Sequence, residues 1–480
     1  MIRKLGKDAA IYGGGDFLFK IIGFAVFPIY THLFTVAEFG TIALLAASSS
    51  LVGVFINIGV NNAVQRFYWD PATPEEDRPL LVTTGFVQLV ITGVAVTTLL
   101  WFGLAWQQQF IADKYAIPWS ALSLALLAIL PDQMLQYLLD AIRLRFSPLR
   151  FLLISFCKNI LGIALGLVFV LHYEGGLTGM FLGALLASLL TVPLGLWMVR
   201  EDLVWRFSAR ILKTLLHFGY PFVFAGIAYW VSNAMDRWML AQLGNSVEVG
   251  LYGVAFKFAV IVTFVVSAFG QAWSPYAIRL LRDDPDYRRT YSKVLSIWLF
   301  CLAFIGLGIA LFSGELLMTF TPAPYWPAAP VMIFVALGAA AFGTTQITAV
   351  GISLERRSGL LTCGAILSGA TNFGLNLWLI PWAGAIGAAV ATLISYLVLT
   401  LFFLYWTQRL HPIPLEKGRL LYGCSLFPLA LGGLILIPDG NIVAWLVAVK
   451  LLVLILVLAG AVPVGLVSAK FLNSFLKLKP

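Results

Sequence analysis

The sequence predicts an all-α protein that crosses a lipid bilayer about fourteen times. Of its 480 residues, 60% are hydrophobic and only 11% are charged, and the mean hydropathy is +0.93. Soluble domains carry roughly 25% charged residues, so this chain has too few of them to cover a surface that faces water. No long polar linker separates the apolar stretches. The bilayer is therefore the expected solvent for most of the chain.

Each predicted span is an apolar run close to the length of a spanning helix, which needs about 20 mainly apolar residues. The first run follows a basic start and resembles a signal peptide. Asp16 and Lys20 interrupt it and no convincing small-residue cleavage site follows, so we expect a retained helix. The predicted spans are 9–34, 41–62, 80–105, 118–139, 150–172, 177–199, 215–242, 249–270, 292–314, 328–350, 359–380, 384–406, 420–437 and 441–467.

Basic residues lie almost entirely in alternate loops between these spans. With a cytoplasmic N-terminus, 25 of the 31 Lys and Arg residues fall in cytoplasmic segments, five fall within spans, and the outer loops hold only Lys114. The positive-inside rule describes an asymmetry in this direction. The pattern therefore predicts that both termini are cytoplasmic, and it supports an even number of spans.

Two halves of the chain share local sequence at an offset of 208 to 210 residues. Because this offset covers six predicted spans, the halves should have parallel topology, which is one known plan of transporters. We expect two six-helix bundles, 1–205 and 206–415, followed by two additional helices and a cytoplasmic tail in 416–480. The matching positions are Glu38-x-Gly40 with Glu248-x-Gly250, Gly166-Leu167 with Gly374-Leu375, and Gly176-x-x-Gly179 with Gly384-x-x-Gly387.

Ionisable residues inside the first predicted span are the first candidates for a site. Such residues cost roughly 2.5–3.5 kcal/mol each on insertion scales and usually face a partner or a cavity. Asp16 and Lys20 are four residues apart and share a helix face, next to the flexible run Gly13–Gly15. They are either a neutralised pair that lets the helix insert or a switchable pair that lines a cavity.

The seventh span corresponds to the first one in the repeat and also carries an acid and a base. Asn233, Asp236 and Arg237 lie there on adjacent turns. A substrate site between the two halves would place charged residues on equivalent helices in this way. The alternative is a buried salt bridge between helices.

The remaining polar candidates in the spans favour an anionic passenger. Lys158 and Lys257 either line a cavity or extend toward an interface, while Gln346 and Asn372 could bind sugar hydroxyls. With Lys20, Arg237 and Lys450, the spans hold five bases against two acids, Asp16 and Asp236. A diphosphate is a natural partner for such an excess of Lys and Arg.

Several functional classes find no support in the sequence. It has no Walker A, GxSxG or HExxH motif, so we expect no enzyme activity and no ATP hydrolysis, and an H⁺ or Na⁺ gradient is a candidate driving force. The scattered cysteines and histidines suggest no metal site or other cofactor. No basic segment is interleaved with exposed aromatic residues, so a nucleic-acid partner is not expected.

Residues 16–31 read DFLFKIIGFAVFPIYT and are followed by Glu38-Phe39-Gly40. These segments resemble the first helix pair of polysaccharide (O-antigen type) flippases of the multidrug/oligosaccharidyl-lipid/polysaccharide exporter superfamily, and the resemblance continues in order along nearly the whole chain. The further segments that fit are Gln65-Arg66-Phe67-Tyr68, Asp236-Arg237, the stretch 249–257 that ends in Lys257, and Gly384-Ala-Ile-Gly387.

This resemblance implies two six-helix bundles around a central cavity, two extra helices, and alternating access. It implies an undecaprenyl-diphosphate-linked oligosaccharide that is moved from the cytoplasmic to the periplasmic or outer leaflet of the inner (plasma) membrane. Membrane lipid, a polysaccharide polymerase and other assembly proteins are the further partners it suggests. It adds Arg66 to the candidate cavity residues.

Two alternatives remain open at the level of sequence. The first is a small-molecule or drug exporter of the same superfamily, against which fourteen spans and a basic cavity argue. The second is a non-transporting membrane subunit of a polysaccharide synthase, whose buried basic residues would tolerate replacement by Ala.

Overall fold

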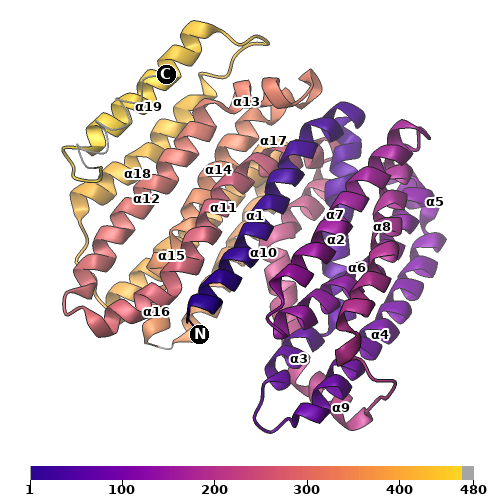
Figure 1. Cartoon of the computed structure of the whole chain (residues 1–480). Helices are drawn as coiled ribbons and strands as arrows, with labels where there is room; N and C mark the ends of the chain where they lie inside the picture. The colour runs from indigo at the N-terminus through magenta and orange to yellow at the C-terminus, as the bar shows by residue number, and fades with distance from the viewer. Residues whose placement is uncertain (1, 356, 468–480) are drawn as a thin grey trace. The chain divides into compact units, whose positions relative to one another are not determined.

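The computed structural model describes residues 2–355 and 357–467, with the side chains of 2–14, 16, 17, 20, 274, 275, 278, 282 and 358 excepted. This described part consists of α-helices and short 3-10 helices joined by loops, without strands. The chain divides into two compact units, Met1–Trp238 and Met239–Pro480 (Figure 1). The protein is therefore all-α, and its long apolar helices make it a polytopic membrane protein.

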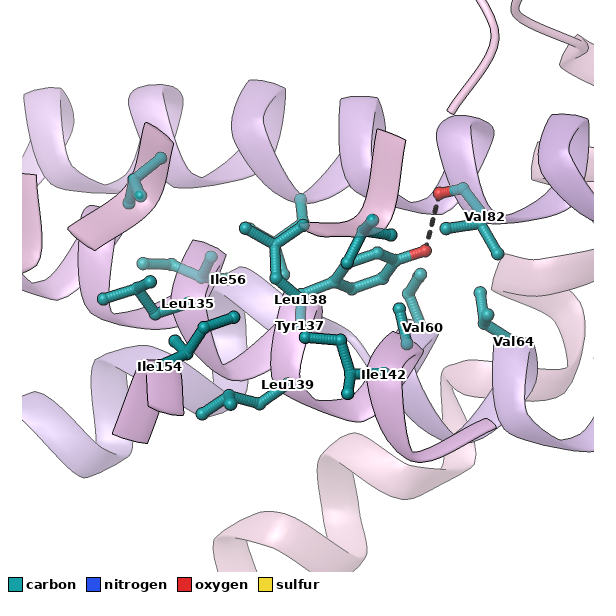
Figure 2. Close-up of a cluster of buried hydrophobic side chains, with 14 of the residues drawn as sticks. Ile56, Val60, Val64, Val82, Leu135, Tyr137, Leu138, Leu139, Ile142 and Ile154 are labelled. Carbon is teal, nitrogen blue, oxygen red and sulfur yellow. Dashed lines mark hydrogen bonds between the residues drawn. The ribbon is translucent and has the colours of Figure 1, made fainter. Parts of the chain in front are cut away.

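The first unit is built around α6, which contacts helices on several sides. Figure 2 shows its side chains packed with residues of neighbouring helices, with the hydroxyl of Tyr137 donating a hydrogen bond of 2.7 Å to the carbonyl oxygen of Val82. The elements are α1 (Ile2–Leu33), α2 (Val36–Asn57), α3 (Val60–Tyr68), η1 (Glu75–Asp77), α4 (Arg78–Trp106), α5 (Gln108–Tyr115), α6 (Trp119–Leu144), α7 (Pro148–Leu171), α8 (Gly176–Val199), η2 (Arg200–Asp202), α9 (Ala209–Gly219) and most of α10 (Pro221–Leu243).

The second unit contains the remaining helices, with the C-terminal pair α18 and α19 among them. Its core includes Phe300 and Leu307 of α12 packed with Leu426 of α18 and Val457 of α19. The elements are α11 (Ser246–Asp283), α12 (Tyr287–Leu311), α13 (Ser313–Phe320), η3 (Ala323–Ala328), α14 (Ala329–Gly343), α15 (Thr345–Thr348), α16 (Val350–Leu354), α17 (Ser358–Leu410), α18 (Lys417–Leu431), η4 (Gly432–Leu434) and α19 (Ala444–Ala461).

The long element α17 is a hairpin of two antiparallel helices. Its backbone leaves helical geometry at Gly384, where φ is 54° and ψ is −131°. The hydroxyl of Ser368 donates to the carbonyl oxygen of Ser395 at 3.0 Å, although 27 residues separate them. A straight helix would place them about 40 Å apart. The separate spans predicted at 359–380 and 384–406 are confirmed.

All fourteen predicted spans coincide with helices of the described chain. By length and hydropathy, ten helices could cross a membrane, or eleven when α9 and α10, which meet at a 42° bend, form one span. The smaller number follows from counting the α17 hairpin once, from the 15-residue length of α18, and from α1, whose segment Ile21–Leu33 counts only as a shorter apolar helix.

Two pairs of positions that the predicted repeat matches have alike local geometry in the two units. Gly176 and Gly384 start equivalent helices with φ of 50° and 54°, a conformation that favours glycine. Thr35 caps α2 and Asn245 caps α11 in the same way, each side chain accepting a hydrogen bond from the backbone N–H of a glutamate three residues on.

The boundary between the two compact units lies at 238/239, whereas the sequence repeat places the boundary before α9 and α10. The predicted boundary at 205/206 assigns both helices to the second half. In the structure most of α10 packs in the first unit, where the indole N–H of Trp230 donates to the carbonyl oxygen of Ala47 at 2.7 Å. Repeat boundaries and packing boundaries are different properties, so the predicted domain limits stay a prediction.

Two interrupted helices of the first unit cross at a pair of glycines. The chain breaks between α2 and α3 at Ile58 and Gly59, with φ of 48° and 71°, and between α9 and α10 beside Gly219. A Cβ atom at Gly59 would lie 2.1 Å from the carbonyl oxygen of Gly219, and one at Gly219 would lie 2.6 Å from that of Ile58. The two backbones therefore approach too closely for any side chain.

A second packing constraint is a buried ion pair in the second unit. The ammonium of Lys450 in α19 lies 2.5 Å from a carboxylate oxygen of Glu315 in α13, with 0% and 9% of the two side chains exposed. Phe312 covers the ammonium at 5.8 Å from its ring centroid. Lys450 is one of the five bases counted in the predicted spans. Its side chain is enclosed by protein, and its ion pair with Glu315 holds α19 against α13.

We predict that Gly59→Ala destabilises the protein because the new methyl group meets backbone and the residue keeps a left-handed conformation, which alone costs about 1–2 kcal/mol. Thermal unfolding of the purified protein in detergent would measure the loss. Gly103→Ala in α4, where no atom lies within 4 Å of the new Cβ, is the matched control and should be neutral or stabilising. Equal melting temperatures for the two variants would contradict the crossing.

We predict that Lys450→Met lowers stability strongly, since breaking a buried ion pair costs about 3–5 kcal/mol. The double variant Lys450→Met with Glu315→Leu should recover much of this loss, because no unpaired charge remains buried. The same thermal measurement tests both. If the double variant is no more stable than the single one, the pair is not the source of the loss.

Candidate functional site

An ion pair and a hydrogen bond to the same carboxylate join three helices of the first unit. The ammonium of Lys158 in α7 lies 2.9 Å from a carboxylate oxygen of Asp132 in α6, and the hydroxyl of Ser188 in α8 donates a hydrogen bond to the same oxygen. The side chains of Lys158 and Asp132 are 33% and 43% exposed. Of the predicted site residues, Lys158 is therefore paired, and its partner was not among the candidates.

All three residues lie near the midpoints of their helices. Asp132 is about 18 Å from either end of α6 at 1.5 Å per residue, and Ser188 is placed similarly in α8. Lys158 lies about 15 Å from the start of α7. Since the hydrocarbon core of a bilayer is about 30 Å thick, this cluster lies near its centre.

The sequence-based charge inventory is corrected by Asp132. This residue falls inside the predicted span 118–139 but was not counted among the acids of the spans. Its signal in the sequence is the polar group Asp132-Gln133 next to Pro131, continued by Gln136 and Asp140 at helical spacing. With Lys450 also neutralised by Glu315, the predicted excess of positive charge becomes smaller.

A second polar cluster lies near the C-terminal end of α6, which ends at Leu144. The side-chain amide of Asn61 donates to Asp140 at 2.8 Å, and Arg143 donates to the same carboxylate at 3.2 Å. Arg66, at the end of α3, pairs instead with Asp70 at 2.8 Å and is 58% exposed. The structure thus places Arg66 in a local ion pair, apart from the mid-helix cluster.

The candidates of α10 share one side of that helix. The guanidinium of Arg237 donates to the backbone carbonyl of Asn233 at 2.8 Å, and the amide of Asn233 donates to that of Tyr229 at 2.8 Å. Asn233 is exposed, Arg237 half-buried, and Asp236 buried. Asn233 and Arg237 are therefore brought together, as the sequence suggested.

In the second unit, Asn372 belongs to a buried chain of polar side chains inside the α17 hairpin. Its amide donates to the hydroxyl of Thr392 at 3.4 Å and its carbonyl oxygen accepts from the amide of Asn376 at 2.9 Å. Tyr252 of α11 contacts Thr392 at 3.3 Å through their hydroxyls. This chain occupies the interface between the two halves of the hairpin and α11.

The two remaining candidates of the second unit lie at different depths of burial. Lys257 of α11 is exposed, and Gln346 of α15 is half-buried against Gly270 of α11. Asp16 and Lys20 belong to α1, but their side chains lie outside the described residues. Among the described residues, no three His, Cys, Asp or Glu side chains are grouped as a metal site would require.

Known proteins with similar sequences include members of a polysaccharide biosynthesis family and a protein named as a flippase. A family model described as polysaccharide biosynthesis protein matches residues 29–330. An Lsg locus protein of Haemophilus influenzae is 20% identical over 58% of this chain and 67% of its own length. A Haloferax volcanii protein named "Probable flippase AglR" is 27% identical over 50% of this chain and 52% of its own.

Solved structures with the same fold include two transporters of known type. A lipid II flippase, MurJ, in an inward closed conformation matches 93% of this chain and 96% of its own with a TM-score of 0.73 and 14% identity. An inward-facing multidrug resistance transporter of the MATE family, within the MOP superfamily, matches 83% and 94% with a TM-score of 0.61 and 12% identity. Since the family model covers more than half of the chain, the protein belongs to this polysaccharide biosynthesis family, and it shares its fold with these two transporters.

Proposed function

We propose that the chain moves an undecaprenyl-diphosphate-linked oligosaccharide from the cytoplasmic to the periplasmic or outer leaflet by alternating access, for the synthesis of cell-surface polysaccharide. The observation that carries this proposal is the accessible cation at mid-membrane depth, Lys158, in a member of a polysaccharide biosynthesis family. Its ion pair with Asp132 leaves a third of the Lys158 side chain exposed, and at this depth the exposed part requires water or a polar ligand rather than lipid tails. A diphosphate supplies such a partner.

The charge balance of the spans supports an anionic passenger more than a cationic one. After Lys450 is set aside with Glu315, the remaining bases are Lys20, Lys158, Arg237 and Lys257, against three acids, Asp16, Asp132 and Asp236. Cationic drugs, the alternative suggested by MATE-type structures of similar fold, would favour an acidic site instead.

The sidedness follows from the distribution of basic residues. A cytoplasmic location of both termini places 25 of the 31 Lys and Arg residues inside, as expected for an inner (plasma) membrane protein. We further propose that a polysaccharide polymerase and other assembly proteins receive the product. Consumption of the product, or an ion gradient, would then drive the net direction, without catalysis by this chain.

We expect Arg237→Ala and Lys257→Ala to reduce translocation by roughly 10- to 100-fold, since a hydrogen bond to a charged group contributes about 1.5–3 kcal/mol. The measurement is a leaflet-specific assay of lipid-linked sugar in spheroplasts or reconstituted vesicles. Lys114→Ala is the matched control, because Lys114 is also an exposed Lys but lies in the predicted outer loop. It should move the lipid at the wild-type rate.

Two outcomes would contradict the proposal at different levels. If the cavity variants and the control all move the lipid equally, the assigned residues are wrong. If deletion of the gene leaves no lipid-linked precursor accumulating in the inner leaflet, the flippase function is wrong. Resistance to cationic drugs conferred by the wild type would favour the drug-exporter alternative.

A further inference from the structure

The ion pairs Glu315–Lys450 and Asp132–Lys158 each join two helices, and they differ in access to solvent. Glu315 and Lys450 are enclosed, with 9% and 0% of their side chains exposed. Asp132 and Lys158 have 43% and 33% exposed although they lie near the middle of α6 and α7. Charges in contact with hydrocarbon at that depth are strongly unfavourable. The open side of the Asp132–Lys158 pair therefore faces water or a polar ligand.

The carboxylate of Asp132 has two partners on different helices. It forms an ion pair with Lys158 of α7 and accepts a hydrogen bond from the hydroxyl of Ser188 of α8. Among the described residues, α2, α3 and α4, which also pack against α6, carry Glu38, Arg66 and Arg78, all near helix ends rather than at this depth. Asp16 and Lys20 are carried by α1, which packs on α7 through Gly15 and Leu152, and their side chains lie outside the described residues.

A polar stripe connects this pair with one end of the unit. Along α6, Asp132 is followed at helical spacing by Gln136, Asp140 and Arg143. Gln136 is exposed and its amide lies 3.5 Å from Asp140, which in turn accepts from Arg143. By the charge distribution, the end with Arg143 is the cytoplasmic one. Asp140 is buried against Asn61 and Arg143, so the exposed members Gln136 and Arg143 mark a polar path of about 16 Å along α6 to Lys158.

We propose that the Asp132–Lys158–Ser188 cluster is a subsite for the diphosphate of the passenger, in which Asp132 occupies the place of the ligand anion when the site is empty. Lys158 exchanges Asp132 for a diphosphate oxygen, and Ser188 keeps the released carboxylate in position. A pair this exposed is weak and exchanges at little cost. Lys158 is the binding residue, whereas Asp132 and Ser188 are positioning residues that set how tightly an anion binds.

This inference rests on the proposed function and assigns a new role to Asp132. An internal carboxylate competes with the ligand for Lys158, so weakly anionic groups fail to displace it. A diphosphate, with more charge and a bidentate geometry, succeeds. The cluster therefore selects for strongly anionic head groups and releases them again, since Asp132 returns to Lys158 when the ligand leaves.

The test measures binding to the full chain in nanodiscs of phosphatidylcholine, with farnesyl diphosphate as the probe and farnesol as its uncharged counterpart. Lys158→Gln should weaken the binding of farnesyl diphosphate at least 10-fold and leave the binding of farnesol unchanged. Asp132→Asn should strengthen the binding of farnesyl diphosphate several-fold, because the competing carboxylate is replaced by a neutral amide. The same variant should slow translocation. Ser188→Ala should change the diphosphate affinity without changing that of farnesol.

Controls separate folding, ligand source and function. Lys158→Arg keeps the charge and should retain most of the affinity, and thermal unfolding checks that each variant is folded. If Asp132→Asn weakens the binding of farnesyl diphosphate, Asp132 has only a structural role and the inference is overturned. Displacement of the probe by phosphatidylglycerol at equal concentration would assign the site to bilayer lipid and also overturn it. If the wild type binds no farnesyl diphosphate, the proposed function itself fails, whereas equal binding by wild type and Lys158→Gln removes only the subsite.

Discussion

Every charge placed within this bundle must be neutralised by protein or reached by water, and this constraint decides how its helices are used. Lipid tails offer no hydrogen bonds and no counter-charge. The protein satisfies the constraint in two ways. It encloses Glu315 with Lys450, and it leaves Asp132 with Lys158 half accessible. The first arrangement fastens helices together, and the second leaves charged groups available to a ligand.

Interruptions of the helical backbone also determine how the helices pack. Helices of the first unit are interrupted at Ile58–Gly59 and beside Gly219, and these interruptions meet. In the second unit, the carboxylate of Glu248 accepts a hydrogen bond of 2.6 Å from the backbone N–H of Ala385, just after the turn of the α17 hairpin. The glutamate that identified the sequence repeat thus caps a helix start, where a negative charge is favourable.

The fold could be predicted from the sequence because its signals are local. Apolar length located the helices, and the positive φ of Gly176 and Gly384 explains why glycine pairs mark the hairpins in both halves. The packing of α10 in the first unit could not be predicted, because Trp230 and Ala47 are 183 residues apart in the chain. No local pattern reports such a contact.

The candidate site was predicted only in part. Lys158 was found because a lone base in an apolar run is conspicuous, and Asn233 with Arg237 because they are four residues apart. Asp132 was overlooked beside Pro131, and Ser188 is one of many hydroxyl residues in apolar helices. What joins these three residues is the packing of α6, α7 and α8, which a single sequence does not reveal.

The Glu315–Lys450 pair also has a consequence for how the protein is made. The two residues are 135 positions apart, so the carboxylate is synthesised long before its cation. At 5–20 residues per second, the ribosome needs on the order of 10 s to bridge that distance. During this interval the Glu315 carboxylate lacks its cation, so α13 cannot take its packed position before α19 arrives. Completion of the second unit is thereby delayed until α19 has entered the membrane.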